Sequence, residues 1–194
     1  GLQLIPLMGG LLLTSIISGR IISRTGKYRL FPILGTLLGV IGMALLTRIT
    51  IDSPTWQLYL FTGVLGMGLG LVMQVLVLAV QNSVSSSQYG VATSGVTLFR
   101  SIGGAIGVAL FGAVFTHGLQ SGLIARLPEG AELPHELNPV AIHHLPDALR
   151  LGYLDAFGSA IHAVFMIAAG IMVLAFVLSW FLRESPLRRD NAHP

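Results

Sequence analysis

The sequence predicts an all-α protein that crosses a membrane several times. Of its 194 residues, 53% are hydrophobic and only 10% are charged, and the mean hydropathy is +0.80. A soluble domain would carry about 25% charged residues. The apolar residues form continuous runs, whereas the strands of a membrane barrel would alternate apolar and polar positions. The runs therefore indicate membrane-spanning helices.

Five runs are long enough for such helices, each of which needs about 20 apolar residues. Pro146 followed by Asp147 is typical of a helix start, and we expect that helix to run into the last span. A polar external loop is expected at about 117–157 and a cytoplasmic tail at 183–194. The five predicted spans are residues 2–19, 30–47, 57–80, 91–116 and 158–182.

The start of the chain and its basic residues predict its context and orientation. The chain begins with Gly1 and is apolar from Leu2, so we expect it to be the C-terminal part of a longer protein. Three Lys or Arg residues lie on one side of the predicted spans and seven on the other, which the positive-inside rule places in the cytoplasm. The seven are Arg20, Arg24, Lys27, Arg29, Arg183, Arg188 and Arg189.

Arg100 is the one formal charge inside a predicted span. It lies roughly 14 Å from the cytoplasmic end of the fourth helix at about 1.5 Å per residue, close to the middle of the membrane. A charge there is costly and is expected to face the protein interior or a wet cavity. Two roles are compatible with this position: a group in a transport pathway, or a tie that hydrogen-bonds the carbonyls of adjacent helices. On the same helix stripe lie Thr93, Thr97, Ser101 and Gly104.

Gln74 is a second polar residue within a predicted span. An amide in hydrocarbon needs a partner, so it is expected either to line a cavity and bind ligand or to hydrogen-bond a neighbouring helix. Several glycines have the small-xxx-small spacing that lets helices approach closely, and we expect them to serve packing. These pairs are Gly35 with Gly39, Gly66 with Gly70, and Gly103 with Gly107. The cluster of Gly63, Gly66, Gly68 and Gly70 is denser than packing alone would require, so it is a candidate site of bending.

The residues needed for catalysis or metal binding are missing from the sequence. There is no cysteine, and the histidines lack the spacing of a zinc site. No phosphate loop, nucleophile elbow or pair of intramembrane carboxylates is present. We therefore expect no metal, no cofactor and no enzymatic activity. The net charge of +3 suggests contact with a membrane surface rather than with nucleic acid, because the basic residues lie between apolar runs.

The segment from Gly19 to Arg29 resembles the loop signature of the major facilitator superfamily (MFS), Gly-x-x-x-Asp-Arg-x-Gly-Arg-Arg. Gly19, Arg24 and Gly26 match, and Lys27 matches conservatively. Ser23 replaces the Asp and Tyr28 replaces the last basic residue, with Arg29 one place late. The resemblance implies a basic, tight-turned cytoplasmic loop, and loss of the Asp removes the basis for a charge-relay role.

A longer resemblance is to the end of the fourteen-helix drug:proton antiporters of the EmrB/QacA group. In that group a long external loop precedes the final helix, and the five spans would be the last five helices. The matching residues are Gln81, Asn82, Gly90, Ala92, Thr93, Phe99, Arg100, Gly103, Gly104, Gly107, Gly112 and the segment 183–188.

This resemblance implies multidrug efflux across the inner (plasma) membrane, in which amphipathic or cationic small molecules are exported by proton antiport and alternating access. The expected partners are a small-molecule substrate, protons, the lipid bilayer and the remaining N-terminal helices, with a periplasmic adaptor as a further candidate. Arg100, Thr97, Ser101, Thr93 and Gln74 are the candidates for the pathway or for coupling. The alternatives are a proton-coupled exporter of one metabolite or siderophore, a passive channel and a non-transporting membrane scaffold.

Overall fold

The computed structural model describes residues 4–50, 53–126 and 147–182. Within these ranges the chain forms five α-helices and one short 3-10 helix, and no strand. The elements are α1 (Ile5–Thr25), α2 (Leu30–Leu46), α3 (Thr55–Asn82), η2 (Ser86–Gln88), α4 (Tyr89–Arg126) and α5 (Asp147–Ser179).

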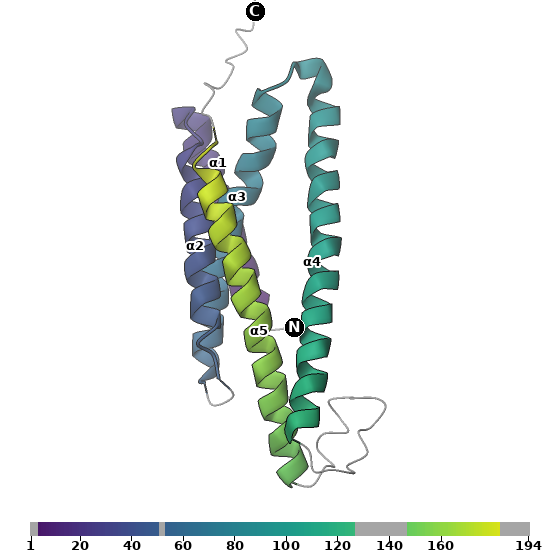
Figure 1. The fold of residues 1–194 in the computed structure, drawn as a ribbon. Coiled ribbons are helices and arrows are strands. Elements are labelled where there is room, and N and C mark those ends of the chain that lie inside the picture. The colour runs from purple at the N-terminus through teal and green to yellow at the C-terminus, as the bar shows by residue number, and fades with distance from the viewer. Residues whose placement is uncertain (1–3, 51–52, 127–146, 183–194) are drawn as a thin grey trace, which may run out of the picture.

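The helices form a packed group with one helix set apart. α3 packs along both α1 and α2, and α5 lies against α2 (Figure 1). α4 packs against α5 near its C-terminal end and makes few contacts with α3. It therefore stands away from α1, α2 and α3 over much of its length (Figure 1).

Four of the described helices, α1, α3, α4 and α5, are long and apolar enough to cross a membrane. The fifth, α2, has only 17 residues, a length of roughly 26 Å at about 1.5 Å per residue. It packs between α3 and α5, and its buried positions include three glycines, Gly35, Gly39 and Gly42. Large apolar side chains lie mostly outside instead: Leu12, for example, is 58% exposed in the isolated chain. This distribution suits helices that face lipid or further helices.

Two faces of α3 approach its neighbours at backbone distance. A Cβ atom added at Gly66 or Gly70 would collide with the backbone of α1 at Leu7 or Leu11. On another face, a Cβ at Gly68 would lie 2.6 Å from the Gly35 carbonyl oxygen of α2. Close packing on two neighbours therefore accounts for Gly66, Gly68 and Gly70, whereas a Cβ at Gly63 would meet only Pro6 at 3.8 Å, an ordinary contact. Bending at this cluster stays a prediction.

Gly103 and Gly107 have a different environment. A Cβ at Gly103 would meet no atom within 4 Å, and one at Gly107 would meet only Phe111 of the same helix. No described helix packs on them, so a packing role for this pair stays a prediction.

The two polar segments that flank the predicted spans are more helical than expected. α1 continues to Thr25, so the predicted loop from Gly19 is helical over its first seven residues. At the other end of the molecule, α4 continues to Arg126 and α5 begins at Asp147, as its start signal predicts. The predicted loop at 117–157 is therefore too long. Residues 127–146 and the predicted tail at 183–194 lie outside the described residues.

The additional turns of α4 and α5 pack against each other. Leu119 and Leu123 of α4 form a buried cluster with Tyr153, Ala156 and Ala160 of α5. Phe115 packs against the cluster and meets the ring of Phe157 edge-on, with ring centroids 5.3 Å apart. On the added turns of α4, His117, Gln120 and Ser121 are exposed beside the exposed Ile124. The segment resembles a loop in sequence because few of its residues, Leu119 and Leu123 among them, are buried, and they are buried by the partner helix.

The adjacent glycines of α1 provide a test of the close approach. A Cβ at Gly10 would lie 2.5 Å from the Gly63 carbonyl oxygen, whereas a Cβ at Gly9 would meet nothing within 4 Å. We expect Gly10→Ala to destabilise the full-length protein by about 1–3 kcal/mol, because α1 and α3 must separate. Gly9→Ala is the matched control and should be close to neutral. The free energy of unfolding in mixed micelles measures both, and equal losses for the two variants would contradict the packing argument.

Candidate functional site

Arg100 lies in the first third of α4, on the part of the helix that is separated from α1 and α2. Its side chain is exposed in the isolated chain. Among the described residues it makes no hydrogen bond or ion pair. The partner expected for an intramembrane arginine is therefore not supplied by the part of the chain that the structure describes.

A cavity of about 650 Å³ lies between α3 and α4, and Arg100 borders it. One face of α3 forms the first wall, with Leu69, Val72, Met73, Leu76 and Val80. The α4 wall consists of Val91, Ala92, Gly95, Val96, Phe99 and Arg100. The cavity is thus apolar except for one guanidinium group. The repeat of apolar residues along α3 is the signal from which this wall could have been found in sequence.

The other four predicted pathway residues are not among the residues that line this cavity. Thr97 donates a hydrogen bond to the Thr93 carbonyl oxygen of its own helix at 3.0 Å. Ser101 and Gln74 are exposed in the isolated chain. Arg100 therefore lies on the border between the polar stripe of α4 and its apolar cavity wall.

A hydrogen bond joins α3 and α4 close to residues that line the cavity, Val80 and Ala92. The Gln81 side chain of α3 donates from Nε2 to the Thr93 hydroxyl of α4 at 2.9 Å. Residues 83–88 connect the helices beside this bond and include the short helix η2. From the sequence, Gln81 is identified only among the residues that match the antiporter group, and this contact is not predicted.

The segment that resembles the loop signature lies at the basic end of the molecule. This end carries Arg20, Arg24, Lys27 and Arg29. Gly26 ends α1 in the left-handed conformation with φ of 71°, and its N–H donates to the Ile22 carbonyl oxygen at 2.8 Å. Glycine adopts this conformation without steric cost. The turn therefore needs Gly26, while Gly19 and Arg24 lie on the helix before it.

Arg29 connects this turn to the end of the last helix. Its Nη2 donates to the Trp180 carbonyl oxygen, just after α5, at 3.1 Å. Nearby, the Thr36 hydroxyl of α2 lies 3.3 Å from the Ser179 hydroxyl of α5. A cationic donor at a helix C-terminus satisfies a carbonyl that has no partner within the helix. Arg29, which stands one place after the last basic position of the signature, thus links the start of α2 to the end of α5.

Tyr28 replaces that last basic residue and is buried, with 2% of its surface exposed. It packs in a cluster with Ile22 of α1 and Val75 of α3. The partly buried Phe31 and Leu182 pack on the same cluster. The departure from the signature therefore replaces a charge by an apolar anchor that holds α1, α2 and α3 together.

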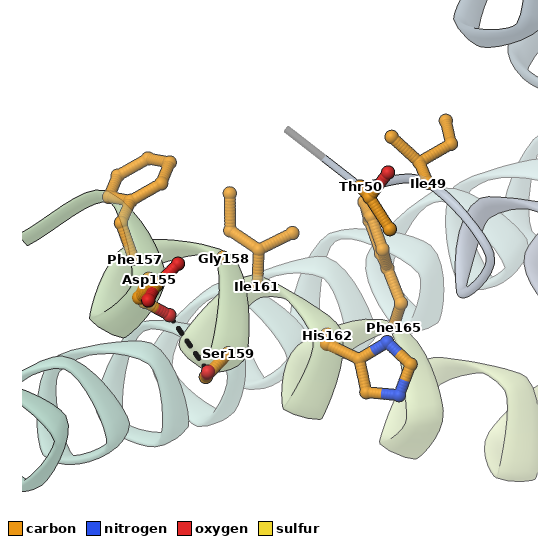
Figure 2. Close-up of a pocket in the computed structure, with 9 residues that line it drawn as sticks. All are labelled: Ile49, Thr50, Asp155, Phe157, Gly158, Ser159, Ile161, His162 and Phe165. Atoms are coloured by element: carbon orange, nitrogen blue, oxygen red, sulfur yellow. Dashed lines mark hydrogen bonds between the residues drawn. The ribbon is translucent and has the colours of Figure 1, made fainter. Parts of the chain in front are cut away.

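A second cavity, of about 520 Å³, lies at the opposite end of the bundle between α5 and residues 49–50 (Figure 2). Asp155, Ser159 and His162 border it from α5, and Phe157 and Phe165 add aromatic surface. Ser159 donates its hydroxyl to the Asp155 carbonyl oxygen at 2.8 Å, so this bond leaves the Asp155 carboxylate free (Figure 2). The two cavities thus differ in character, since an acid borders one and an arginine the other.

Comparison with known proteins places these features in a class. No family model matches the chain. An uncharacterized MFS-type transporter of Mycobacterium tuberculosis is 39% identical over 188 residues, which cover 96% of this chain and 27% of the relative. A tetracycline resistance determinant of Streptomyces rimosus is 30% identical, with 95% of this chain and 61% of the relative covered. The multidrug transporter protein MdtP of Bacillus subtilis is 39% identical over 115 residues, or 59% of this chain and 21% of the relative.

These similarities define a multi-pass helical membrane protein. More particularly, its helices are similar to a part of the helical bundle of MFS-type transporters, as the sequence predicts. The chain corresponds to only a part of the length of each of these relatives. The relatives are named as transporters or as a resistance determinant, in agreement with the expectation that the chain is not an enzyme.

Arg29 and Arg24 form a matched pair for testing the tie at the basic end. Arg29 bonds the Trp180 carbonyl oxygen, whereas Arg24 is exposed and has no such bond among the described residues. A hydrogen bond of a charged donor that remains partly hydrated contributes about 1 kcal/mol. We expect Arg29→Ala to speed amide hydrogen exchange at residues 177–182 about fivefold, and Arg24→Ala to leave it nearly unchanged. Unchanged exchange in the Arg29 variant would show that this hydrogen bond does not stabilise the end of α5.

A second pair tests the hydrogen bond between α3 and α4. Thr93→Val keeps the side-chain shape but removes the acceptor of the Gln81 amide. We expect it to lower the free energy of unfolding of the full-length protein by about 1 kcal/mol. Thr97→Val, which loses only a bond within α4, should cost less. A loss in the Thr97 variant as large as that in the Thr93 variant would contradict a special role for the contact between the helices.

Proposed function

We propose that this chain is the C-terminal transmembrane portion of an MFS exporter from the fourteen-helix drug:proton antiporter group. The whole protein exports amphipathic small molecules across the inner (plasma) membrane in exchange for protons, by alternating access. The observation that carries the proposal is the apolar cavity between α3 and α4, with Arg100 at its border. Apolar cavities with a few placed polar groups are typical binding sites for small molecules.

The attachment of α4 supports alternating access. α4 contacts α3 little, and a hydrogen bond from Gln81 to Thr93 and the cluster around Leu123 attach it towards its two ends. Between these points its wall of the cavity has no described helix behind it. A helix held in this way permits a change in the width of the cavity without loss of the packing between α1, α2 and α3.

The names of two relatives support the transport of drugs. One carries the name of a tetracycline resistance determinant and another that of a multidrug transporter. The excess of basic residues at one end supports a cytoplasmic position for that end. The partners proposed are the small-molecule substrate, protons, the bilayer and the N-terminal helices of the same protein, with a periplasmic adaptor as an additional partner.

The experiment uses the full-length protein in inverted membrane vesicles with an imposed proton gradient and a pH-sensitive dye. Addition of tetracycline or of unrelated amphipathic compounds should release protons with the wild type. We expect Arg100→Ala to reduce the initial rate at least about tenfold, because a lost charge contact costs about 1.5–3 kcal/mol. Arg150→Ala, at the start of α5 and outside the cavity, is the control. No proton release with any compound would refute proton-coupled export, and release with a single compound only would favour a dedicated metabolite exporter.

A further inference from the structure

The charge on the described walls of the cavity between α3 and α4 is positive only. Among the described residues that line it, Arg100 is the only charged one. Residues 53–126, which contain both helices and their connection, include no Asp and no Glu. The one acidic side chain that the structure describes, Asp155, borders the other cavity, at the opposite end of the bundle. The part of the chain that forms this cavity therefore supplies a cation and no counter-charge.

A guanidinium group in such surroundings favours a negatively charged ligand. Transfer of an ion to an apolar site is costly unless it is paired, so an anion that enters the cavity lowers the cost of placing Arg100 there. The planar guanidinium also matches carboxylate, phosphate and similar groups with paired hydrogen bonds. A cationic ligand meets the opposite situation, because like charges brought together in an apolar environment repel strongly.

We propose that the cavity between α3 and α4 binds amphipathic organic anions. The anionic group lies at Arg100 and the apolar body lies against Phe99, Met73 and Leu76. This inference rests on the proposed function, since it names the substrate class of that exporter. The volume of about 650 Å³ suits such a ligand, since small-molecule pockets measure about 300–1,000 Å³.

The apolar walls restrict the ligand further. Beside Arg100, the cavity residues are aliphatic side chains, two small residues, one methionine and one aromatic ring. A small hydrophilic anion would lose its hydration without gaining apolar contact. The proposed ligands are therefore anions with a hydrocarbon or aromatic body rather than inorganic phosphate or short carboxylic acids.

Two ions of nearly the same size and shape test the proposal: tetraphenylborate, an anion, and tetraphenylphosphonium, a cation. Their binding to the purified full-length protein in nanodiscs is measured by titration calorimetry, with protein-free nanodiscs as the blank. We expect the wild type to bind tetraphenylborate at least about tenfold more tightly, which corresponds to about 1.4 kcal/mol. Equal or tighter binding of tetraphenylphosphonium would overturn the proposal.

Substitutions test whether the preference for the anion comes from Arg100. Arg100→Gln should remove the preference for the anion, Arg100→Lys should retain a part of it, and Arg150→Gln should leave it unchanged. A preference that survives in Arg100→Gln would overturn the proposal. Met73→Trp provides a second test that keeps the arginine: an indole in the cavity should weaken the binding of both ions, and unchanged binding of both would place their site elsewhere. Size-exclusion profiles show that each variant is folded.

The binding experiment needs no proton gradient, so its result is independent of the test of proton-coupled export. Proton-coupled export without a preference for tetraphenylborate would refute the anion site and keep the exporter. The preference for the anion without proton release in vesicles would keep the site and refute the antiport. A simple anion competitor, benzoate, should displace tetraphenylborate from the wild type only at much higher concentration, because it has less apolar surface to bury.

Discussion

The backbone contact at the glycines of α3 is the constraint on which the rest of the bundle depends. On one face of α3, Gly66 and Gly70 allow the backbone of α1 to approach, and on another face Gly68 meets Gly35 of α2. At this spacing there is no room for a methyl group, so the relative positions of three helices are set by the absence of side chains. In lipid, where apolar burial alone does not drive helices together, such close packing is a main source of association.

The close packing of α1, α2 and α3 contrasts with the loose attachment of α4. Because α1, α2 and α3 are held at backbone distance, the wall of the cavity on α3 has a defined position. α4 supplies the opposite wall, and the hydrogen bond from Gln81 to Thr93 joins it to α3 near the start of α4. The molecule thus combines a fixed wall with one that is held mainly near its ends. The arginine lies on the second wall, where a change in the width of the cavity would alter its surroundings.

The candidate site could be found in sequence only in part. Arg100 was identified because a charge within an apolar run is visible without a structure. It borders the cavity, and its role in transport stays a prediction. The bonds from Gln81 to Thr93 and from Arg29 to the Trp180 carbonyl oxygen were not predicted. Each joins two helices, and the second joins residues 151 positions apart in the chain. Local patterns carry no information about such pairs. The helical turns near Leu119 and Tyr153 were missed because their apolar stripe is buried only by the partner helix.

The sequence by itself determined that this is an α-helical membrane protein, because runs of apolar residues leave the backbone no other way to satisfy its hydrogen bonds in lipid. It also determined which helix carries an intramembrane charge, since composition along the chain decides that. Only the tertiary structure decided which glycines face which neighbour, where the cavity lies and that Arg100 is the one charged residue among the described residues that line it. These features depend on the rotation and separation of helices, which are set by the contact of side chains from distant segments and not by the apolar character that the segments share.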